Sequence, residues 1–249
     1  MEKILMDVAN LGKIFVRTKS DYGFKDIVLH TFRYFKQRKE AADFVALQDV
    51  SLQLYSGESI AILGANGAGK STLLSILAGI VKPSSGTITV NGKIGLMLEL
   101  GSGFCHDLTG RENIYLNGLL LGAQKSDLEQ DIDKIIDFSG VRDFIDEPLR
   151  TYSTGMQTRL GFSIAVHIKP DILLIDEVLA VGDSEFRRKC YAKLQALKEA
   201  GVGTVLVTHS LDDALQFCNK AIYLEHGKIR FAGTCTAVVD AVRQCNCEY

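Results

Sequence analysis

The stretch from Gly64 to Ser71 reads GANGAGKS. No other part of the sequence restricts the possible fold of this chain as much. Its G-x-x-x-x-G-K-[ST] spacing is that of a phosphate-binding loop, in which glycines let successive backbone N–H groups point at a polyphosphate. The pattern predicts that Lys70 places a positive charge on the β- and γ-phosphates and that the Ser71 hydroxyl is an oxygen ligand of Mg²⁺. The predicted nucleotide-binding residues of this segment are Gly64, Ala65, Asn66, Gly67, Ala68, Gly69, Lys70, Ser71 and Thr72.

The flanking residues favour this interpretation over a chance match in a glycine-rich turn. Ser59 to Leu63 is a short apolar run that is partly β-branched, as expected of a buried parallel strand. Thr72 to Gly79 carries apolar residues at helical spacing and ends on a glycine suited to a helix C-terminus. The phosphates are therefore expected at a helix N-terminus, where the helix dipole favours negative charge.

A second hydrophobic strand is predicted from Asp171, and two adjacent acids, Asp176 and Glu177, lie at its C-terminal end. Ligands of open parallel sheets bind at the carboxyl ends of the strands. Asp176 therefore fits the magnesium-anchoring carboxylate, and Glu177 is the candidate that orients or deprotonates the attacking water. The alternative is an acid pair that caps a surface turn. His209 follows another predicted strand, Thr204 to Thr208, and is either a γ-phosphate contact or a structural histidine.

The composition narrows the class of protein. A chain of 249 residues with 47% hydrophobic residues has enough material for one large domain or a core with a subdomain. The net charge of −2 gives no reason to expect nucleic-acid binding. No apolar run approaches the roughly 18 residues that span a bilayer, and Met1 to Gly12 has no signal-peptide core. We therefore expect a cytosolic protein whose membrane role comes through a partner. The six cysteines lack the paired spacing of a zinc site. Cys245 and Cys247 offer a metal-binding alternative, but we expect reduced thiols.

The segment from Arg17 to Val45 is rich in basic and aromatic residues. At helical spacing it forms one apolar stripe and one basic stripe, made of Phe24, Val28, Phe32 and Phe35 and of Arg33, Lys36 and Lys39. Two interpretations stay open. The helix lies against a membrane surface or partner, or it packs its apolar stripe on the protein's own core.

The rest of the chain is predicted as follows. Strands are expected at Ile4 to Val8 and at Ala46 to Leu54. A hairpin is expected between Thr87–Val90 and Ile94–Leu98, because Asn91-Gly92, a dipeptide typical of hairpin turns, lies between them. Residues from about 105 to 168 are expected to form a helical subdomain.

Four further segments carry a family resemblance. Tyr152 to Met156 reads YSTGM and opens a predicted helix. Ser153 and Gly155 match the LSGGQ signature of the ATP-binding cassette (ABC) family, whereas Thr154 and Met156 do not match its most common form. The other segments are Leu96 to Phe104, Leu108 to Ile114 and Leu179 to Cys190. Over nearly its whole length the chain resembles the ABC family, and within it the subgroup that energises export of bacterial polysaccharides, whose members tend to carry an insertion after the first strand.

The resemblance implies an α/β fold: a P-loop NTPase core of the ABC ATPase type with an antiparallel β subdomain and an inserted helical subdomain. It also implies roles for individual residues. Phe15 would stack on adenine, and Asp183 would be the dimer-interface aspartate. Glu99 stands where most cassettes have the glutamine that reaches Mg²⁺ and the water, and a carboxylate can also ligate Mg²⁺. Ser153 and Gly155 would present helix N–H groups to the γ-phosphate.

The partners implied by the resemblance are a second copy of the chain, two ATP between the copies, and permease subunits in the membrane. The cargo would be a lipid-linked polysaccharide, reached through the permease at the cytoplasmic face of the bacterial inner membrane. Some O-antigen members carry a further C-terminal sugar-binding domain, and we expect none after Tyr249. Alternatives are export of another cargo, such as a drug, lipid or lipoprotein, and a soluble cassette acting on DNA or ribosomes. The last class generally has a long coiled coil or two cassettes, which this chain lacks.

Overall fold

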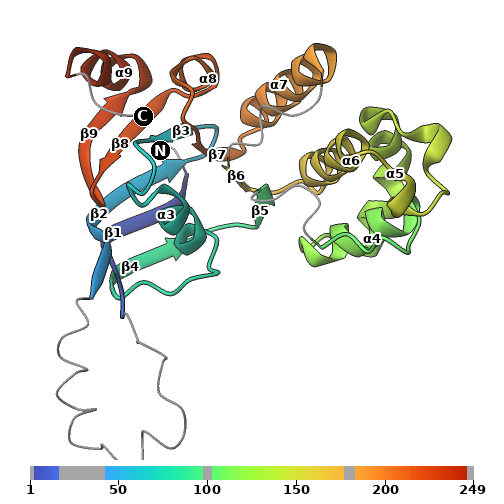
Figure 1. Ribbon diagram of the computed structural model, residues 1–249, viewed down its shortest axis with the longest axis horizontal. Helices are drawn as coiled ribbons and strands as arrows, with labels where there is room; N and C mark the ends of the chain where they lie inside the picture. The colour runs from blue at the N-terminus through green and yellow to red at the C-terminus, as the bar shows by residue number, and fades with distance from the viewer. Residues whose placement is uncertain (1–2, 17–42, 98–102, 177–182, 246–249) are drawn as a thin grey trace, which may run out of the picture.

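Two β-sheets form the framework of the chain (Figure 1), whose computed structural model describes residues 3–16, 43–97, 103–176 and 183–245. The smaller sheet is antiparallel, with strand order β2-β1-β4, and consists of β1 (Ile4–Phe15), β2 (Phe44–Tyr55) and β4 (Ser85–Val90). The larger sheet has the order β5-β6-β7-β3-β8-β9 and is parallel except for β9. Its strands are β3 (Ser59–Leu63), β5 (Ile94–Met97), β6 (Ile172–Asp176), β7 (Gly203–Val207), β8 (Lys220–Glu225) and β9 (Lys228–Thr234).

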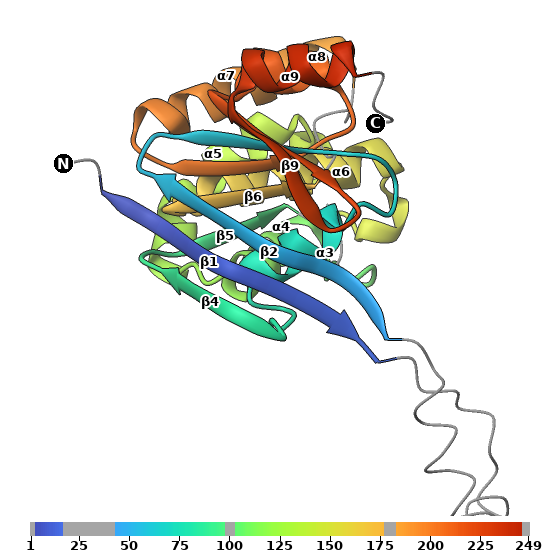
Figure 2. The ribbon, with the colours of Figure 1, turned by 90° about the vertical axis from the view of Figure 1, so that its left-hand side faces the viewer.

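The central strands are buried on both faces, as their near-continuous apolar sequences predict. In β3, Ile60 and Ile62 pack toward the smaller sheet, while Ala61 and Leu63 pack toward the opposite helices. Helix α3 (Lys70–Leu77) fills the space between the two sheets with its leucines and Ile76 (Figure 2). The other face of the large sheet is covered by α7 (Ser184–Glu199), α8 (Leu211–Phe217) and α9 (Cys235–Gln244).

A helical subdomain is inserted between β5 and β6 and has its own core. It contains α4 (Gly110–Leu120), α5 (Lys125–Ser139), α6 (Thr154–His167) and two 3₁₀ turns, Arg142–Phe144 and Leu149–Thr151. One face of α6 contributes Leu160 and Ile164 to the subdomain core, and the other contributes Phe162 to the main core. Helix α6 therefore connects the subdomain to the core through buried side chains.

The predicted hairpin across Asn91-Gly92 is wrong. Its two strands belong to different sheets, because β4 pairs with β1 and β5 pairs with β6. Backbone bonds at the turn lead to other segments as well: the Asn91 N–H donates to the Leu5 carbonyl oxygen (2.8 Å), and the Lys93 N–H donates to the Asp171 carboxylate (2.8 Å). The apolar strand β5 is better buried in the larger sheet, which is covered on both faces, than it would be beside the exposed strand β4.

The strand after the insertion starts at Phe44, so Phe44 and Val45 form the beginning of β2 rather than the end of the insertion. The two predicted stripes of the insertion, from Phe24 to Lys39, lie outside the described residues. Among the described helices, none is long and apolar enough to cross a membrane.

Candidate functional site

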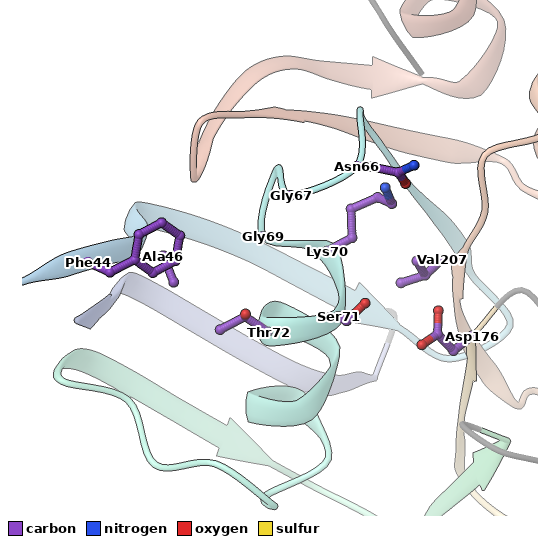
Figure 3. A pocket seen from close by; sticks show the side chains of 10 residues that line it. All are labelled: Phe44, Ala46, Asn66, Gly67, Gly69, Lys70, Ser71, Thr72, Asp176 and Val207. Carbon is purple, nitrogen blue, oxygen red and sulfur yellow. The ribbon is translucent and has the colours of Figure 1, made fainter. Parts of the chain in front are cut away.

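A pocket of about 490 Å³ opens at the carboxyl ends of β3, β6 and β7 (Figure 3). It gathers seven of the residues predicted from the loop and the acids: Asn66, Gly67, Gly69, Lys70, Ser71, Thr72 and Asp176. Three residues that were not predicted complete its lining: Phe44, Ala46 and Val207. Segments distant in the sequence thus meet at the edge of the sheet where parallel α/β folds bind ligands.

The loop conformation requires glycine where it approaches neighbouring strands. Gly69 is the N-cap of α3 with a φ of 107°, and a Cβ there would lie 2.7 Å from the Ala46 carbonyl oxygen. Gly64 has a φ of 146°, and its Cβ would lie 2.3 Å from the Leu224 carbonyl oxygen. A side chain at either position would strain the backbone and collide with a carbonyl oxygen. Glycine therefore lets the loop pack closely against β2 and β8.

The loop is also tied to the rest of the fold by backbone hydrogen bonds. The Gly227 N–H, in the turn between β8 and β9, donates to the Ala68 carbonyl oxygen (3.0 Å). The Gln48 N–H of β2 donates to the Gly227 carbonyl oxygen (2.8 Å). These bonds fix β2 beside the loop and explain why Ala46 reaches the pocket.

The Lys70 side chain lies inside the loop and is only 7% exposed. Its ammonium donates to the carbonyl oxygens of Gly64 (2.7 Å) and Ala65 (3.0 Å). The first turn of α3 contains no acidic residue, so nothing in that turn offsets the positive end of the helix dipole. A buried cation and a helix N-terminus at one place favour a polyphosphate.

Ser71 and Asp176 face the same part of the pocket, with the hydroxyl pointing toward the carboxylate (Figure 3). Both are hard oxygen donors of the kind that Mg²⁺ prefers, so the residues present fit this ion. Asp176 ends β6 and pairs with Val207 of β7, and the exposed His209 follows two residues later. The structure therefore brings Asp176 and His209 to the ends of adjacent strands. Glu177 and Glu99 lie outside the described residues.

The predicted signature occupies the start of α6. Ser153 is the N-cap, and its hydroxyl accepts a hydrogen bond from the Met156 N–H (3.2 Å). The nearest atom that a Cβ on Gly155 would meet, apart from its chain neighbours and the backbone of α6, is the Ser153 Oγ at 3.9 Å, within the part of the chain that the structure describes. Neither residue lines the pocket. The first turn of α6 has no acidic residue, so the N-terminus of α6 favours an anion, as that of α3 does.

Asp183 caps α7, where one carboxylate oxygen accepts from the Phe186 N–H (2.8 Å) and the other pairs with Arg159 of α6. The Phe186 N–H and then the Arg159 charge hold the pKa of Asp183 below its ordinary value. Arg159 also lies over the Phe186 ring, 5.3 Å from its centroid. This linkage between the signature helix and α7 was not predicted, although Arg159 lies about one turn beyond the signature.

Phe44 is the main pocket residue missed by sequence reasoning. Phe15, predicted to stack on adenine, does not line the pocket, but it pairs directly with Phe44 in the β1–β2 ladder. The signal was an aromatic residue two positions before the predicted strand from Ala46, but Phe44 and Val45 were assigned to the insertion. The role of Phe15 stays a prediction.

Comparisons with known proteins agree with this geometry. The sequence profile of the family described as ABC transporter matches residues 47–180. The O-antigen export system ATP-binding protein RfbB of Klebsiella pneumoniae is 44% identical over 222 residues, which cover 89% of this chain and 90% of that protein. The teichoic acids export ATP-binding protein TagH of Enterococcus faecalis is 46% identical over 190 residues, which cover 76% of this chain and 42% of TagH.

Solved structures show the same fold. The dimeric ATP-binding cassette MJ0796, in a post-hydrolysis state bound to ADP and Pi, matches with a TM-score of 0.73 and 22% identity, over 93% of this chain and 99% of that one. The match confirms the predicted P-loop core with its antiparallel β subdomain. The chain belongs to the ABC transporter family, as one of its ATP-binding cassettes.

Proposed function

We propose that the chain is the ATP-hydrolysing subunit of an exporter that carries a lipid-linked polysaccharide through a membrane permease. The observation that carries this proposal is the pocket of Lys70, Ser71 and Asp176 in a chain 44% identical, over most of its length, to an O-antigen export ATP-binding protein. The resemblance to a teichoic acids export protein points to the same class of cargo. The chain would act at the cytoplasmic face of the membrane.

Different residues of the pocket would perform different steps of ATP binding and hydrolysis. Lys70 and the start of α3 hold the phosphates, and Ser71 and Asp176 would hold Mg²⁺. When bound, Mg²⁺ offsets phosphate charge. In this proposal Glu177 takes a proton from the attacking water, His209 contacts the γ-phosphate and Glu99 reaches the metal side of the site.

The second half of the site would come from another copy of the chain. Ser153 and Gly155 lie outside the pocket, although their helix end favours an anion. MJ0796, which shares the fold, is dimeric. A head-to-tail pair would place the α6 N-terminus of each copy on the ATP held by the other, with Asp183 at the interface.

Export in cells tests the proposed cargo. The chromosomal gene is deleted, and the strain receives the wild-type chain or Lys70→Ala. Only the wild-type chain should restore surface polysaccharide, while strains without it should accumulate lipid-linked polymer inside the cell. A membrane permease should co-purify with both chains. Normal surface polysaccharide in the deletion strain would rule out this cargo.

A further inference from the structure

Hydrogen bonds hold the residues on both sides of His209. The preceding Thr208 is buried, and its N–H donates to the Ile62 carbonyl oxygen of β3 (3.4 Å). The Thr208 hydroxyl in turn accepts from the Ser210 N–H (3.0 Å). His209 is exposed between these two residues. The turn between β7 and α8 therefore sets the direction in which His209 leaves the sheet.

Helix α8 begins directly after this turn. Ser210 is its N-cap, and the Ser210 hydroxyl accepts from the Asp213 N–H (3.1 Å). Because α8 has only 7 residues, its own hydrogen bonds stabilise it little, and its placement depends on contacts with other elements. One set of contacts is made in the main core by Leu211, Ala214 and Phe217.

Helix α7 supplies further contacts, because it binds α8 at both ends. At the start of α8, the Tyr191 hydroxyl donates to the Asp213 carboxylate (2.7 Å). At the end of α8, the Lys198 ammonium donates to the Phe217 carbonyl oxygen (3.2 Å). Both helices lie on the same face of the larger sheet (Figure 2). The Tyr191 bond thus lies at the His209 end of α8, and the Lys198 bond lies at the far end.

The bond between Tyr191 and Asp213 has the properties of a strong contact. Its length of 2.7 Å is typical of a hydroxyl that donates to a carboxylate, and bonds to a charged acceptor are about twice as strong as neutral ones. The Tyr191 ring packs against the main core and is partly buried. Burial, and next the Asp213 carboxylate, raise the pKa of Tyr191 above its ordinary value, so the hydroxyl keeps its proton near neutral pH.

We infer that Tyr191 is a positioning residue for His209: by holding Asp213 it fixes the start of α8, and with it the turn that carries His209. The inference rests on the proposed function, in which His209 contacts the γ-phosphate. Tyr191 does not line the pocket, so it would act on hydrolysis without touching the nucleotide. A displacement of about 1 Å at a catalytic contact can lower a rate by about 100-fold, so the loss of this bond should be visible in kcat.

Tyr191→Phe removes the hydroxyl and keeps the ring in the core. It should lower kcat for ATP hydrolysis by the purified chain about tenfold and leave KM for ATP unchanged within about twofold, because the phosphate contacts of Lys70 are intact. Lys198→Met is the matched control, since it removes the bond at the far end of α8 and keeps an unbranched side chain. This control should change kcat by less than about twofold.

Two further measurements separate positioning of His209 from a general loss of structure. In a His209→Ala background, Tyr191→Phe should cause no further loss of single-turnover phosphate release, because the effects of residues that act through one another do not add. Amide hydrogen exchange of residues 208–214 should be about tenfold faster in Tyr191→Phe, as expected when a hydrogen bond to a charged group is lost. The same exchange should be unchanged in Lys198→Met.

Wild-type kcat in Tyr191→Phe would overturn the inference, as would unchanged exchange of residues 208–214 in this variant. An equal loss of activity with and without the His209 side chain would show that Tyr191 acts elsewhere. A different pair of results would reject the proposed function, and the inference with it: a wild-type chain that does not hydrolyse ATP, or wild-type hydrolysis by His209→Ala.

Discussion

Lys70 lies at the centre of the phosphate-binding loop, where its ammonium donates to two loop carbonyl oxygens, of Gly64 and Ala65. The side chain is nearly buried, so the loop keeps its shape around a positive charge. Phosphate oxygens entering the pocket meet this charge and the N-terminus of α3 together. Binding and catalysis can therefore be separated by substitution, because the predicted catalytic acid lies on another segment.

Glu177→Gln should leave ATP binding intact and reduce hydrolysis by about 100-fold or more, the usual contribution of a positioned general base. The amide is close to the carboxylate in size but takes up no proton at neutral pH. ATP affinity and single-turnover phosphate release are the two measurements. Lys70→Ala serves as a contrast, because it should lose ATP binding itself. Hydrolysis at the wild-type rate would remove Glu177 from the catalytic role.

Gly155→Ala should fold normally and still lose ATP hydrolysis by about tenfold or more, because an added methyl group holds the approaching phosphate away from the α6 N-terminus. Among the described residues, outside its chain neighbours and the helix's own backbone, the new Cβ would have only the Ser153 Oγ within 4 Å, at 3.9 Å. Gly110→Ala is the contrasting variant, since its Cβ would lie 2.2 Å from the Tyr152 hydroxyl oxygen and should lower the melting temperature. Full activity in Gly155→Ala would show that no phosphate approaches this residue.

At this scale the loop residues were predictable, because their spacing alone defines a phosphate site. Phe44 was not, because its place in the pocket depends on the register of β2 and on the hydrogen bonds that hold this strand beside the loop. The pairing of Arg159 with Asp183 likewise depends on how α6 and α7 pack. Contacts of this kind cannot be obtained from the spacing of residues in one segment.

Among the elements, α5 is joined to the end of α6 by a buried carboxylate. The side chain of Asp131 is 6% exposed and pairs with Lys134 of the same helix (2.6 Å) and with Lys169, which follows α6 (2.8 Å). Hydrogen bonds from Lys134, and next from Lys169, lower the pKa of Asp131 from 3.8 to about 2. The charged form is therefore stabilised in the folded state.

Asp131→Asn should lower the free energy of unfolding by about 1–2 kcal/mol at pH 7, since a hydrogen-bonded charge is lost from a buried site. A folded-state pKa below the unfolded one stabilises the fold above the unfolded value of 3.8, and this stabilisation is lost as the pH falls toward about 2. The difference between the wild-type and variant chains should thus be constant from pH 7 to about 5 and shrink below about 4. Urea denaturation across this pH range measures it.

Glu129→Gln removes one charge from the exposed side of the same helix, where the Lys125 partner is 3.7 Å away, and should change stability little. If the cost of Asp131→Asn stays the same at pH 2, side-chain packing rather than charge accounts for it.

The secondary-structure elements show which predictions a local sequence pattern can make and which it cannot. The strand, loop and helix around the phosphate site were predicted closely, because burial and turn chemistry agree there. The predicted hairpin between Thr87 and Leu98 failed, since the partners of β4 and β5 are strands 70 or more positions away, such as Ile172 for Ile94. Pairing over such distances is decided by which sheet buries the strand.

For the whole molecule, the arrangement of the N-termini of α3 and α6 matters most. The start of α3 belongs to the pocket, whereas the start of α6 belongs to a subdomain with its own core (Figure 1). Buried residues of α6 reach the main core, and Arg159 reaches the beginning of α7. The N-terminus of α6 is therefore connected to the main core and to the start of α7 by direct contacts.

Mixing two inactive variants tests most directly that the pocket and the α6 N-terminus are halves of one ATP site shared between copies. Lys70→Ala removes the positive charge from the pocket, and Ser153→Arg blocks the N-terminus of α6 with a large side chain. In a mixed head-to-tail dimer one interface carries both changes and the other carries none. Equal mixing should therefore restore about a quarter of wild-type ATP hydrolysis, because half the dimers are mixed and each has one intact site. Hydrolysis by the mixture no greater than that of either variant alone would contradict the shared site.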